Sequence, residues 1–513
     1  MSKLIVFFIL FGVDLSAELQ ACLKEFTADG AIEIRENGGR VAPFSGLSWE
    51  VRGATEKPLL HLWSENYNLT RRVLAITDHS EQRLALAVER FGRTRPDRLE
   101  FIRLEFERAQ RDLSREAFCD SLGHLLAEQF PDESLESLTA SPDLEHSISG
   151  NYARGLLRRG SSHFAVLAIP DGESADTVEN SLTFGLLWLD RVRNSNRRGT
   201  INALRLILPK GEARYVAHRA ATLAQDLSIE LYERDPVRET LEKIDLRHAG
   251  NQDTWLVPHR ESQALLDRSR SALDPIVALS PRAVTVHPVA QSREVLLRFR
   301  GLAFARWDDG RIFFGCPDTR EELKASSLPA LKNLLQQLEN YRHPLATETR
   351  HALYRAQPER WLEALVREDV TRVDAALDSR FVYTQVFAHA GGEHGILDLL
   401  TVTRSGRLAI LELKASEHIH LPLQAAGYWL RIRRHLEQRD FVRYGYFPGI
   451  ELQAAPPLVY LVAPALRFHP STDTLLRFLS TELESTRVGL AESWRRGRHA
   501  PVSWWHHEST PYP

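Results

Sequence analysis

Three apolar segments in close succession, followed by a helix, constrain most strongly what this chain can fold into. Strands are expected at about residues 382–387, 395–400 and 408–414, because each segment is apolar and is bounded by turn residues. A Ser-Gly pair between the last two segments favours a tight turn, so these strands should form a hairpin. A Leu-Pro-Leu sequence at residue 421 then starts a helix, since proline is well tolerated in a first turn.

Two of these strands carry acidic side chains in an apolar setting. Side chains alternate faces along a strand, so Glu412 and Lys414 point to one side and their leucine neighbours to the other. The hairpin can place Asp398 beside Glu412, where two carboxylates repel each other unless a cation neutralises them. Mg²⁺, or Mn²⁺ in its place, suits such a pair because it takes oxygen ligands and keeps several waters. Lys414 can orient or deprotonate one such water, which completes the parts needed to hydrolyse a phosphodiester.

The rarity of lysine makes Lys414 informative. Only eight of the 65 basic residues are lysines, which leaves 65 − 8 = 57 arginines. A chain that uses arginine by default would place it in a structural ion pair as well, whereas an ammonium is compact and its pKa shifts readily. A second Glu-x-Lys, at Glu322 and Lys324, is not interpreted as a site because no strand acid precedes it at hairpin distance.

The order Glu…Asp…Glu-x-Lys…Gln-x-x-x-Tyr over about residues 358–434 resembles the PD-(D/E)xK nuclease superfamily, and within it the RecB-like and NucS-like branch. The resemblance implies a restriction-endonuclease-like α/β domain with metal-dependent nuclease activity. It assigns Asp398 and Glu412 to the metal and Lys414 to the attacking water. The residue before the aspartate is Leu397 rather than proline, a departure that the superfamily tolerates.

The same resemblance extends to residues on two helices. It makes Glu363 the helix-borne acid that joins the metal site, with Glu359 one turn earlier as the alternative. Gln424 and Tyr428, one turn apart on a helix face, match the Gln-x-x-x-Tyr element of the branch. Arg431, a further turn on, is then a candidate substrate contact that binds a phosphate.

A purely structural interpretation of these residues stays open. The strand acids would then lie on an exposed edge or form a solvated ion-pair face, although charges within apolar strands are costly unless they are used. Glu363 would be an ordinary helix glutamate, and Tyr428 would pack in a core.

Composition sets outer limits on the class of protein. With 43% hydrophobic and 26% charged residues, the sequence is neither disordered nor collagenous, nor a multi-span membrane protein. The formal charge of −3 requires any nucleic-acid site to be a local patch. Cys22, Cys119 and Cys316 are too far apart for a disulfide framework or a zinc site, which favours the cytoplasm.

An apolar run near the N-terminus leaves one alternative to that compartment. Residues 4–13 are too short to cross a membrane, which takes about 20 apolar residues. With the small residues of 15–17, they also suit a signal peptide at residues 1–17, and hence secretion.

Patterning divides the chain into five segments: a leader or helix at 1–30, a β-rich domain at 31–110, a helical segment at 111–160, an α/β middle domain with a β-rich extension and a linker helix at 161–345, and the nuclease-like domain at 346–513. Buried-strand candidates at 164–169, 204–208 and 229–232 alternate with helices, which indicates a parallel α/β unit. This unit lacks both glycine-rich phosphate-binding motifs, so it is not identified as a nucleotide-binding domain.

The sequence thus predicts a multidomain α/β protein with a C-terminal Mg²⁺- or Mn²⁺-dependent nuclease domain, acting on nucleic acid, with DNA as the expected substrate. The preceding domains would select the substrate, regulate cleavage or mediate assembly, homo-oligomerisation included. Two alternatives remain. One is a nuclease regulated by a ligand of the middle α/β unit, and the other is an inactive nuclease fold that only binds nucleic acid or assembles.

Overall fold

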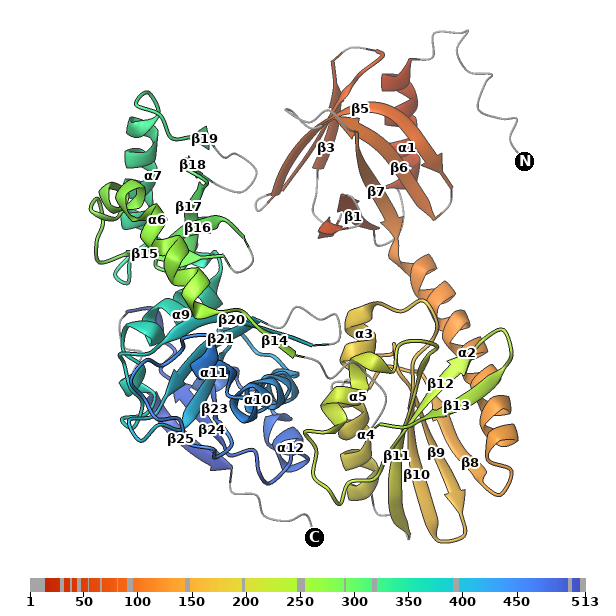
Figure 1. Cartoon of the computed structure of the whole chain (residues 1–513). Coiled ribbons are helices and arrows are strands. Elements are labelled where there is room, and N and C mark those ends of the chain that lie inside the picture. Colours follow the sequence, from red (N-terminus) through yellow and green to blue (C-terminus); the bar gives the residue numbers. More distant parts are fainter. Residues whose placement is uncertain are drawn as a thin grey trace. The chain divides into compact units, whose positions relative to one another are not determined.

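The structure of the chain is a computed structural model. It describes residues 14–27, 32–36, 39–43, 48–53, 55–64, 67–80, 82–89, 96–143, 148–195, 199–246, 254–289, 292–315, 321–390, 396–496 and 501–507. The chain divides into two compact units, Met1–Ser121 and Leu122–Pro513, and the division falls within helix α2 (Leu104–Gln129). Figure 1 shows the helices and strands of each unit.

The first unit is an antiparallel sheet packed against helix α1 (Leu15–Phe26). Its described strands run in the order β2-β1-β7-β6-β5-β4-β3, with the bounds β1 Ile32–Glu36, β2 Gly39–Pro43, β3 Ser48–Arg52, β4 Leu59–Ser64, β5 Tyr67–His79, β6 Arg83–Glu89 and β7 Asp97–Arg103. The helix buries Leu19, Leu23 and Phe26 in the sheet core, because residues three and four apart share one helix face.

The start of α1 bears on the expected leader. Asp14 caps the helix, and its carboxylate accepts hydrogen bonds from the amides of Ser16 and Ala17 at 3.1 and 3.2 Å. Residues 15–17, the small-residue site of a signal peptide, therefore form the first turn of a packed helix. The apolar run of residues 4–13 lies outside the described residues.

The second unit begins with a mixed sheet in the order β13-β12-β11-β10-β9-β8. Its strands are β8 Ser134–Thr139, β9 Ala153–Arg159, β10 Ser162–Ala168, β11 Thr200–Pro209, β12 Ile229–Asp235 and β13 Thr240–Ile244, and its helices are α3 Ala175–Glu179, α4 Ser181–Asn194 and α5 Arg214–Ala220. Strands β10, β11 and β12 are parallel, as the alternating pattern indicates. The segment 111–160 is helical only as far as Gln129, after which β8 and β9 follow.

An antiparallel meander comes next, formed by β15 Val284–Pro288, β16 Glu294–Phe299, β17 Leu302–Asp308, β18 Arg311–Phe314 and β19 Glu321–Glu322. Helices α6 (His259–Val277) and α7 (Leu328–Tyr341) share its hydrophobic core. Arg342, which is fully buried, ties this part to the next, since its guanidinium donates to the carbonyls of Arg300, Leu353 and Ala356.

The C-terminal sheet has the order β14-β20-β21-β22-β23-β24-β25. Its strands are β14 Thr254–Leu256, β20 Tyr383–Ala390, β21 Ile396–Val402, β22 Leu408–Leu413, β23 Leu458–Pro464, β24 Ser485–Leu490 and β25 Pro501–His507. The β20–β21–β22 meander is antiparallel, and β22, β23 and β24 are parallel. The accompanying helices are α8 Ala352–Arg355, α9 Pro358–Glu368, α10 Leu421–Glu437, α11 Asp440–Arg443 and α12 Thr472–Arg477, with short 3₁₀ turns at Val370–Arg372, Ala465–Arg467 and Trp494–Arg496.

Helices α9 and α10 cover opposite faces of this sheet. Leu411 and Leu413 belong to the core beneath α9, whereas Leu408 and Ile410 belong to the core beneath α10. This alternation places Glu412 on the α10 side, as the two-residue period of a strand requires.

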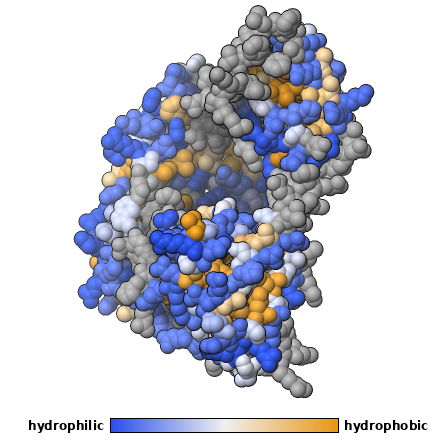
Figure 2. Space-filling model, turned by 90° about the vertical axis from the view of Figure 1, so that its right-hand side faces the viewer, coloured by the Kyte–Doolittle hydropathy of each residue, from blue (hydrophilic) through white to orange (hydrophobic). Residues whose placement is uncertain are grey.

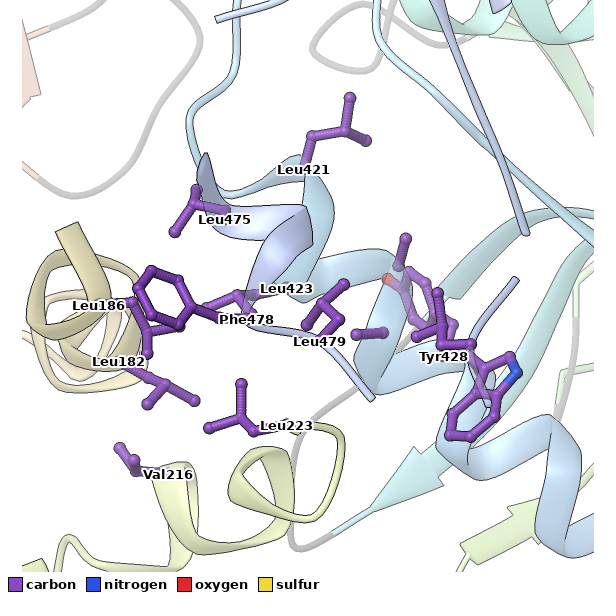
Figure 3. Packing of buried hydrophobic residues seen from close by; sticks show 14 of the residues in the cluster. Leu182, Leu186, Val216, Leu223, Leu421, Leu423, Tyr428, Leu475, Phe478 and Leu479 are labelled. Carbon is purple, nitrogen blue, oxygen red and sulfur yellow. The ribbon is translucent and has the colours of Figure 1, made fainter. Parts of the chain in front are cut away.

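The middle and C-terminal sheets of the second unit share one hydrophobic core. Figure 3 shows Leu182 and Leu186 of α4 facing Phe478 and side chains of α10 and α12. The segments that follow α5 and α12 also form a direct backbone contact, because the amide of Ala224 donates to the carbonyl of Phe478 at 2.9 Å. In addition, β14 comes from the segment assigned to the middle domain but pairs with β20. The second unit is therefore a mixed α/β assembly whose middle and C-terminal sheets are packed together.

The described surface carries no continuous apolar region on the face drawn in Figure 2, where hydrophobic residues form small separate patches. No helix in the described ranges combines the length and apolar character needed to cross a bilayer.

Candidate active site

Asp398 and Glu412 lie on neighbouring antiparallel strands. Leu399 of β21 pairs with Leu411 of β22, so the two acids occupy the adjacent position of that register. Asp398 Oδ2 accepts a hydrogen bond from the amide of Leu413 at 3.0 Å, which fixes the carboxylate against the end of β22. The side chain of Glu412 is 1% exposed and that of Asp398 14%, so the pair opens to solvent on the Asp398 side. The structure thus brings together the two acids that the hairpin pattern predicted.

Lys414 completes the cluster. Its ammonium donates to Glu412 Oε1 at 3.0 Å. Its backbone amide donates to the carbonyl of Val462 at 3.0 Å, which continues the pairing of β22 with β23 and directs the side chain toward the acids. Burial opposes the charge of Lys414, but Glu412 and Asp398 raise its pKa, so the ammonium is held protonated.

The second carboxylate oxygen of Glu412 lacks a partner. Oε2 is buried and accepts no hydrogen bond from any described residue. Burial, followed by the charge of Asp398, raises the pKa of Glu412 to about 8, and burial also raises the pKa of Asp398. A buried acceptor without a donor is costly, which makes this oxygen the strongest local sign that a cation belongs here.

The acids of helix α9 have different surroundings. Glu363 is buried and accepts hydrogen bonds from Arg360 and from Arg298 of β16, the latter at 3.5 Å. Glu359 accepts a hydrogen bond from Ser416 at 3.4 Å, and its charge acts on both Asp398 and Lys414. Both acids are therefore near the cluster, but Glu363 is already neutralised by arginine.

The sequence pattern did not identify Arg360 as a residue of this site. Its Nη1 lies 3.5 Å from Asp398 Oδ1 and also pairs with Glu363, so it bridges the strand acid and the helix acid. The sequence offered only one hint, the spacing of three between Arg360 and Glu363 on a helix. No local sequence pattern indicates the contact of Arg298 with Glu363, because Arg298 lies in a strand of a separate sheet.

Helix α10 presents Gln424 and Tyr428 to the same region. The Gln424 amide donates to the Tyr428 hydroxyl at 3.4 Å. Burial and the nearby charge of Glu412 raise the pKa of Tyr428, so its hydroxyl stays protonated and can donate. Arg431 is 4% exposed, and its guanidinium lies 5.7 Å from the Tyr428 ring centre, so its contact with a phosphate stays a prediction.

The donor set fits a hard divalent ion held by few protein ligands. No group of three or more His, Cys, Asp or Glu side chains in the described ranges is arranged to hold a metal. Mg²⁺ does not need one, because it is commonly held by one or two carboxylates together with waters and substrate phosphates. Asp398 and the unpartnered oxygen of Glu412 supply those carboxylates.

Comparisons with protein-family models and with curated proteins give no match to this chain.

Proposed function

We propose that the cluster of Asp398, Glu412 and Lys414 is the active site of a Mg²⁺-dependent nuclease that hydrolyses phosphodiester bonds of nucleic acid, with DNA as the substrate. The observation that carries the proposal is the buried, unpartnered Oε2 of Glu412 beside a second carboxylate and a lysine. An exposed ion pair would have no reason to bury that oxygen, and a structural pair would satisfy it.

The order of elements supports the same proposal. The strands expected at 382–387, 395–400 and 408–414 and the helix expected from residue 421 correspond to the antiparallel meander β20–β21–β22 and to α10. Mn²⁺ would serve in place of Mg²⁺, since both prefer carboxylate and water ligands.

Each residue of the cluster has a distinct task in this proposal. Asp398 and Glu412 hold the ion, which when bound supplies a Lewis acid for the scissile phosphate. Lys414, whose ammonium is held protonated, orients the attacking water and balances charge at the phosphate. Gln424 and Tyr428 face the site from α10 and can donate hydrogen bonds to the substrate.

The test is cleavage of end-labelled single-stranded, duplex and branched DNA, and of RNA, with Mg²⁺, Mn²⁺ or EDTA. Asp398→Ala should abolish metal-dependent cleavage, whereas Glu322→Ala, in the exposed Glu-x-Lys pair, should retain it. Full cleavage by folded Asp398→Ala protein, or equal cleavage in EDTA, would refute the site. Binding without cleavage under every condition would favour the inactive, nucleic-acid-binding alternative.

A further inference from the structure

A large cavity lies between helix α9 and the meander strands β15 and β16. It measures about 1040 Å³ and is lined by α9, by β15 and β16 of the meander and by the turn at Val370–Arg372. Its shape depends on close backbone contact, because a Cβ at Gly301 (φ +83°) would lie 1.9 Å from the carbonyl oxygen of Arg360. The turn between β16 and β17 therefore rests on the first turn of α9. Neither Asp398 nor Glu412 lines the cavity.

Positive charge predominates in the lining. Three carboxylates, those of Glu363, Glu368 and Asp369, line the cavity. Against them stand six arginines: Arg282, Arg298, Arg300, Arg360, Arg367 and Arg372. The difference of 6 − 3 leaves an excess of three positive charges. This is a local basic patch in a chain whose formal net charge is −3.

Two of the three carboxylates of the cavity are already paired with arginines. Glu363 accepts from Arg360 and Arg298, and Asp369 pairs with Arg372 at 3.2 Å. Arg367 instead points one nitrogen at His287 Nε2, 3.5 Å away, and forms no ion pair with a carboxylate in the described ranges.

The charge of Arg367 is only partly compensated, because the charge of Glu363 acts on Arg367 but is shared with Arg298 and Arg360. Burial, then the charges of Arg298, Arg367 and Arg360, lower the pKa of His287 well below its usual value, so this histidine is neutral. Burial likewise lowers the pKa of Arg298 and of Arg367. Several partly desolvated guanidinium groups thus share one space, and an anion is the group that would offset their mutual repulsion.

We infer that this cavity binds the phosphate of a nucleotide, between Arg367, Arg282 and the arginines that hold Glu363. Guanidinium forks match phosphate oxygens in bidentate geometry, and Arg is preferred over Lys wherever such recognition matters. The volume is at the upper end of small-molecule sites, so it accommodates a nucleotide as well as its phosphate. The phosphate belongs either to a strand end of nucleic acid or to a free nucleotide.

Arg360 links this cavity to the strand acids. It lines the cavity and lies 3.5 Å from Asp398, so a bound phosphate competes with Asp398 for the same guanidinium. A phosphate that draws Arg360 away leaves Asp398 free for a cation. Because coupling between two ligands is reciprocal, a divalent ion should in turn strengthen phosphate binding.

The experiment measures binding to the full chain in EDTA, where metal-dependent cleavage does not occur. The probes are a 3′-labelled dT oligonucleotide with a 5′-phosphate, the same oligonucleotide with a 5′-hydroxyl, and a fluorescent ATP analogue. Arg282→Gln and Arg367→Gln should each weaken binding of a phosphate-bearing probe by about tenfold, which corresponds to about 1.4 kcal/mol. Arg282 is exposed, so its substitution keeps the fold even if that of Arg367 does not.

Arg293→Gln is the matched control, because Arg293 is an exposed arginine of the same meander and does not line the cavity. Its affinity should stay within twofold of the unaltered protein. A preference for the 5′-phosphate over the 5′-hydroxyl identifies a strand end, and binding of the ATP analogue alone identifies a free nucleotide. Affinities in the cavity variants equal to that of Arg293→Gln, or no probe bound below about millimolar concentration, would overturn the inference. Since no cleavage is measured, this outcome is independent of the proposed nuclease activity.

Discussion

Replacing Glu412 by glutamine should change how the stability of the metal-free protein depends on pH. The side chain is 1% exposed, and burial together with Asp398 raises its pKa from 4.5 to about 8. The folded state therefore holds this proton more tightly than the unfolded state does. Stability contributed by the protonated carboxyl is present below about pH 4.5 and is lost as the pH rises toward 8. Glutamine has no carboxyl group to ionise, so the stability of the Glu412→Gln protein does not fall in this way as the pH rises.

The size of this stability loss follows from the pKa shift of Glu412. Each pKa unit corresponds to about 1.4 kcal/mol, so a rise from 4.5 to about 8 costs the native protein about 2 to 3 kcal/mol between pH 5.5 and 7.5. The free energy of unfolding of Glu412→Gln, relative to that of the unaltered protein, should rise by this amount over the same interval. Constant effects of the substitution, such as a weakened contact with Lys414, cancel in the comparison of two pH values.

The assay is urea unfolding followed by tryptophan fluorescence, since Trp361 of α9 and Trp429 of α10 are buried on the two faces of the sheet. Mg²⁺ should stabilise the unaltered protein more at pH 7.5 than at pH 5.5, because it neutralises a carboxylate that is expensive to ionise. That gain should vanish in Glu412→Gln, together with cleavage.

Glu322→Gln provides the control, because Glu322 and Lys324 form the same Glu-x-Lys ion pair, at 2.9 Å, on the surface. The hydrogen bond from Lys324 lowers the pKa of Glu322, so this carboxylate is ionised in both the folded and the unfolded state above about pH 5.5, and the relative stability of Glu322→Gln should be flat between pH 5.5 and 7.5. A relative stability of Glu412→Gln that is flat between pH 5.5 and 7.5 would refute the argument that this carboxylate is buried at a cost.

Four further outcomes are expected. In single-turnover cleavage, Lys414→Arg should be nearly as slow as Lys414→Ala, by about 10²- to 10⁴-fold, because a planar guanidinium cannot take the place of a compact ammonium beside the attacking water, while Lys324→Arg should cleave normally. Glu359→Gln should raise several-fold the Mg²⁺ concentration for half-maximal cleavage, and an unchanged value would exclude it from the metal site. Gly301→Ala should cost more than about 1 kcal/mol in urea unfolding, since a left-handed glycine there touches a neighbouring backbone. Asp14→Ala should destabilise the N-terminal unit by about 1 kcal/mol through loss of a helix cap, and an unchanged melting curve would contradict this.

The strand acids were predictable because their contact is local. Asp398 and Glu412 are separated by one turn and by the two-residue period of two strands, so pattern and hairpin together determine their proximity. The parallel strands of the middle unit were predictable for a similar reason, since buried strands alternate with helices along the sequence. Strand β8 was not, because its sequence SLESLT is polar on both faces and most of it is exposed at the sheet edge.

Contacts between distant segments are not marked by any such pattern in the sequence. Thr254 of β14 pairs with Ala390 of β20, and Arg298 of β16 reaches Glu363 of α9. Each contact depends on how two separately formed elements dock, which no local period encodes. The arginine-lined cavity belongs to this class, since its residues come from the meander and from α9. A lining of arginines is also hidden in a sequence in which 57 of 65 basic residues are arginine.

The acid of helix α9 that belongs to the site could be predicted only in part from the sequence. Sequence order singles out Glu363 and leaves Glu359 as the alternative, because both lie on a helix upstream of the strands. Their surroundings differ, however, since Glu363 accepts from two arginines whereas Glu359 accepts only a long hydrogen bond from Ser416 among the contacts described. A cation would have to displace from Glu363 the guanidinium of Arg360 and the buried guanidinium of Arg298, which leaves uncompensated charge behind. Glu359 can turn to an ion at the cost of one weak contact. The contacts therefore favour Glu359 over Glu363 as the third acid of the proposed metal site, and they give Glu363 the separate role of holding Arg360 between the strand acids and the cavity.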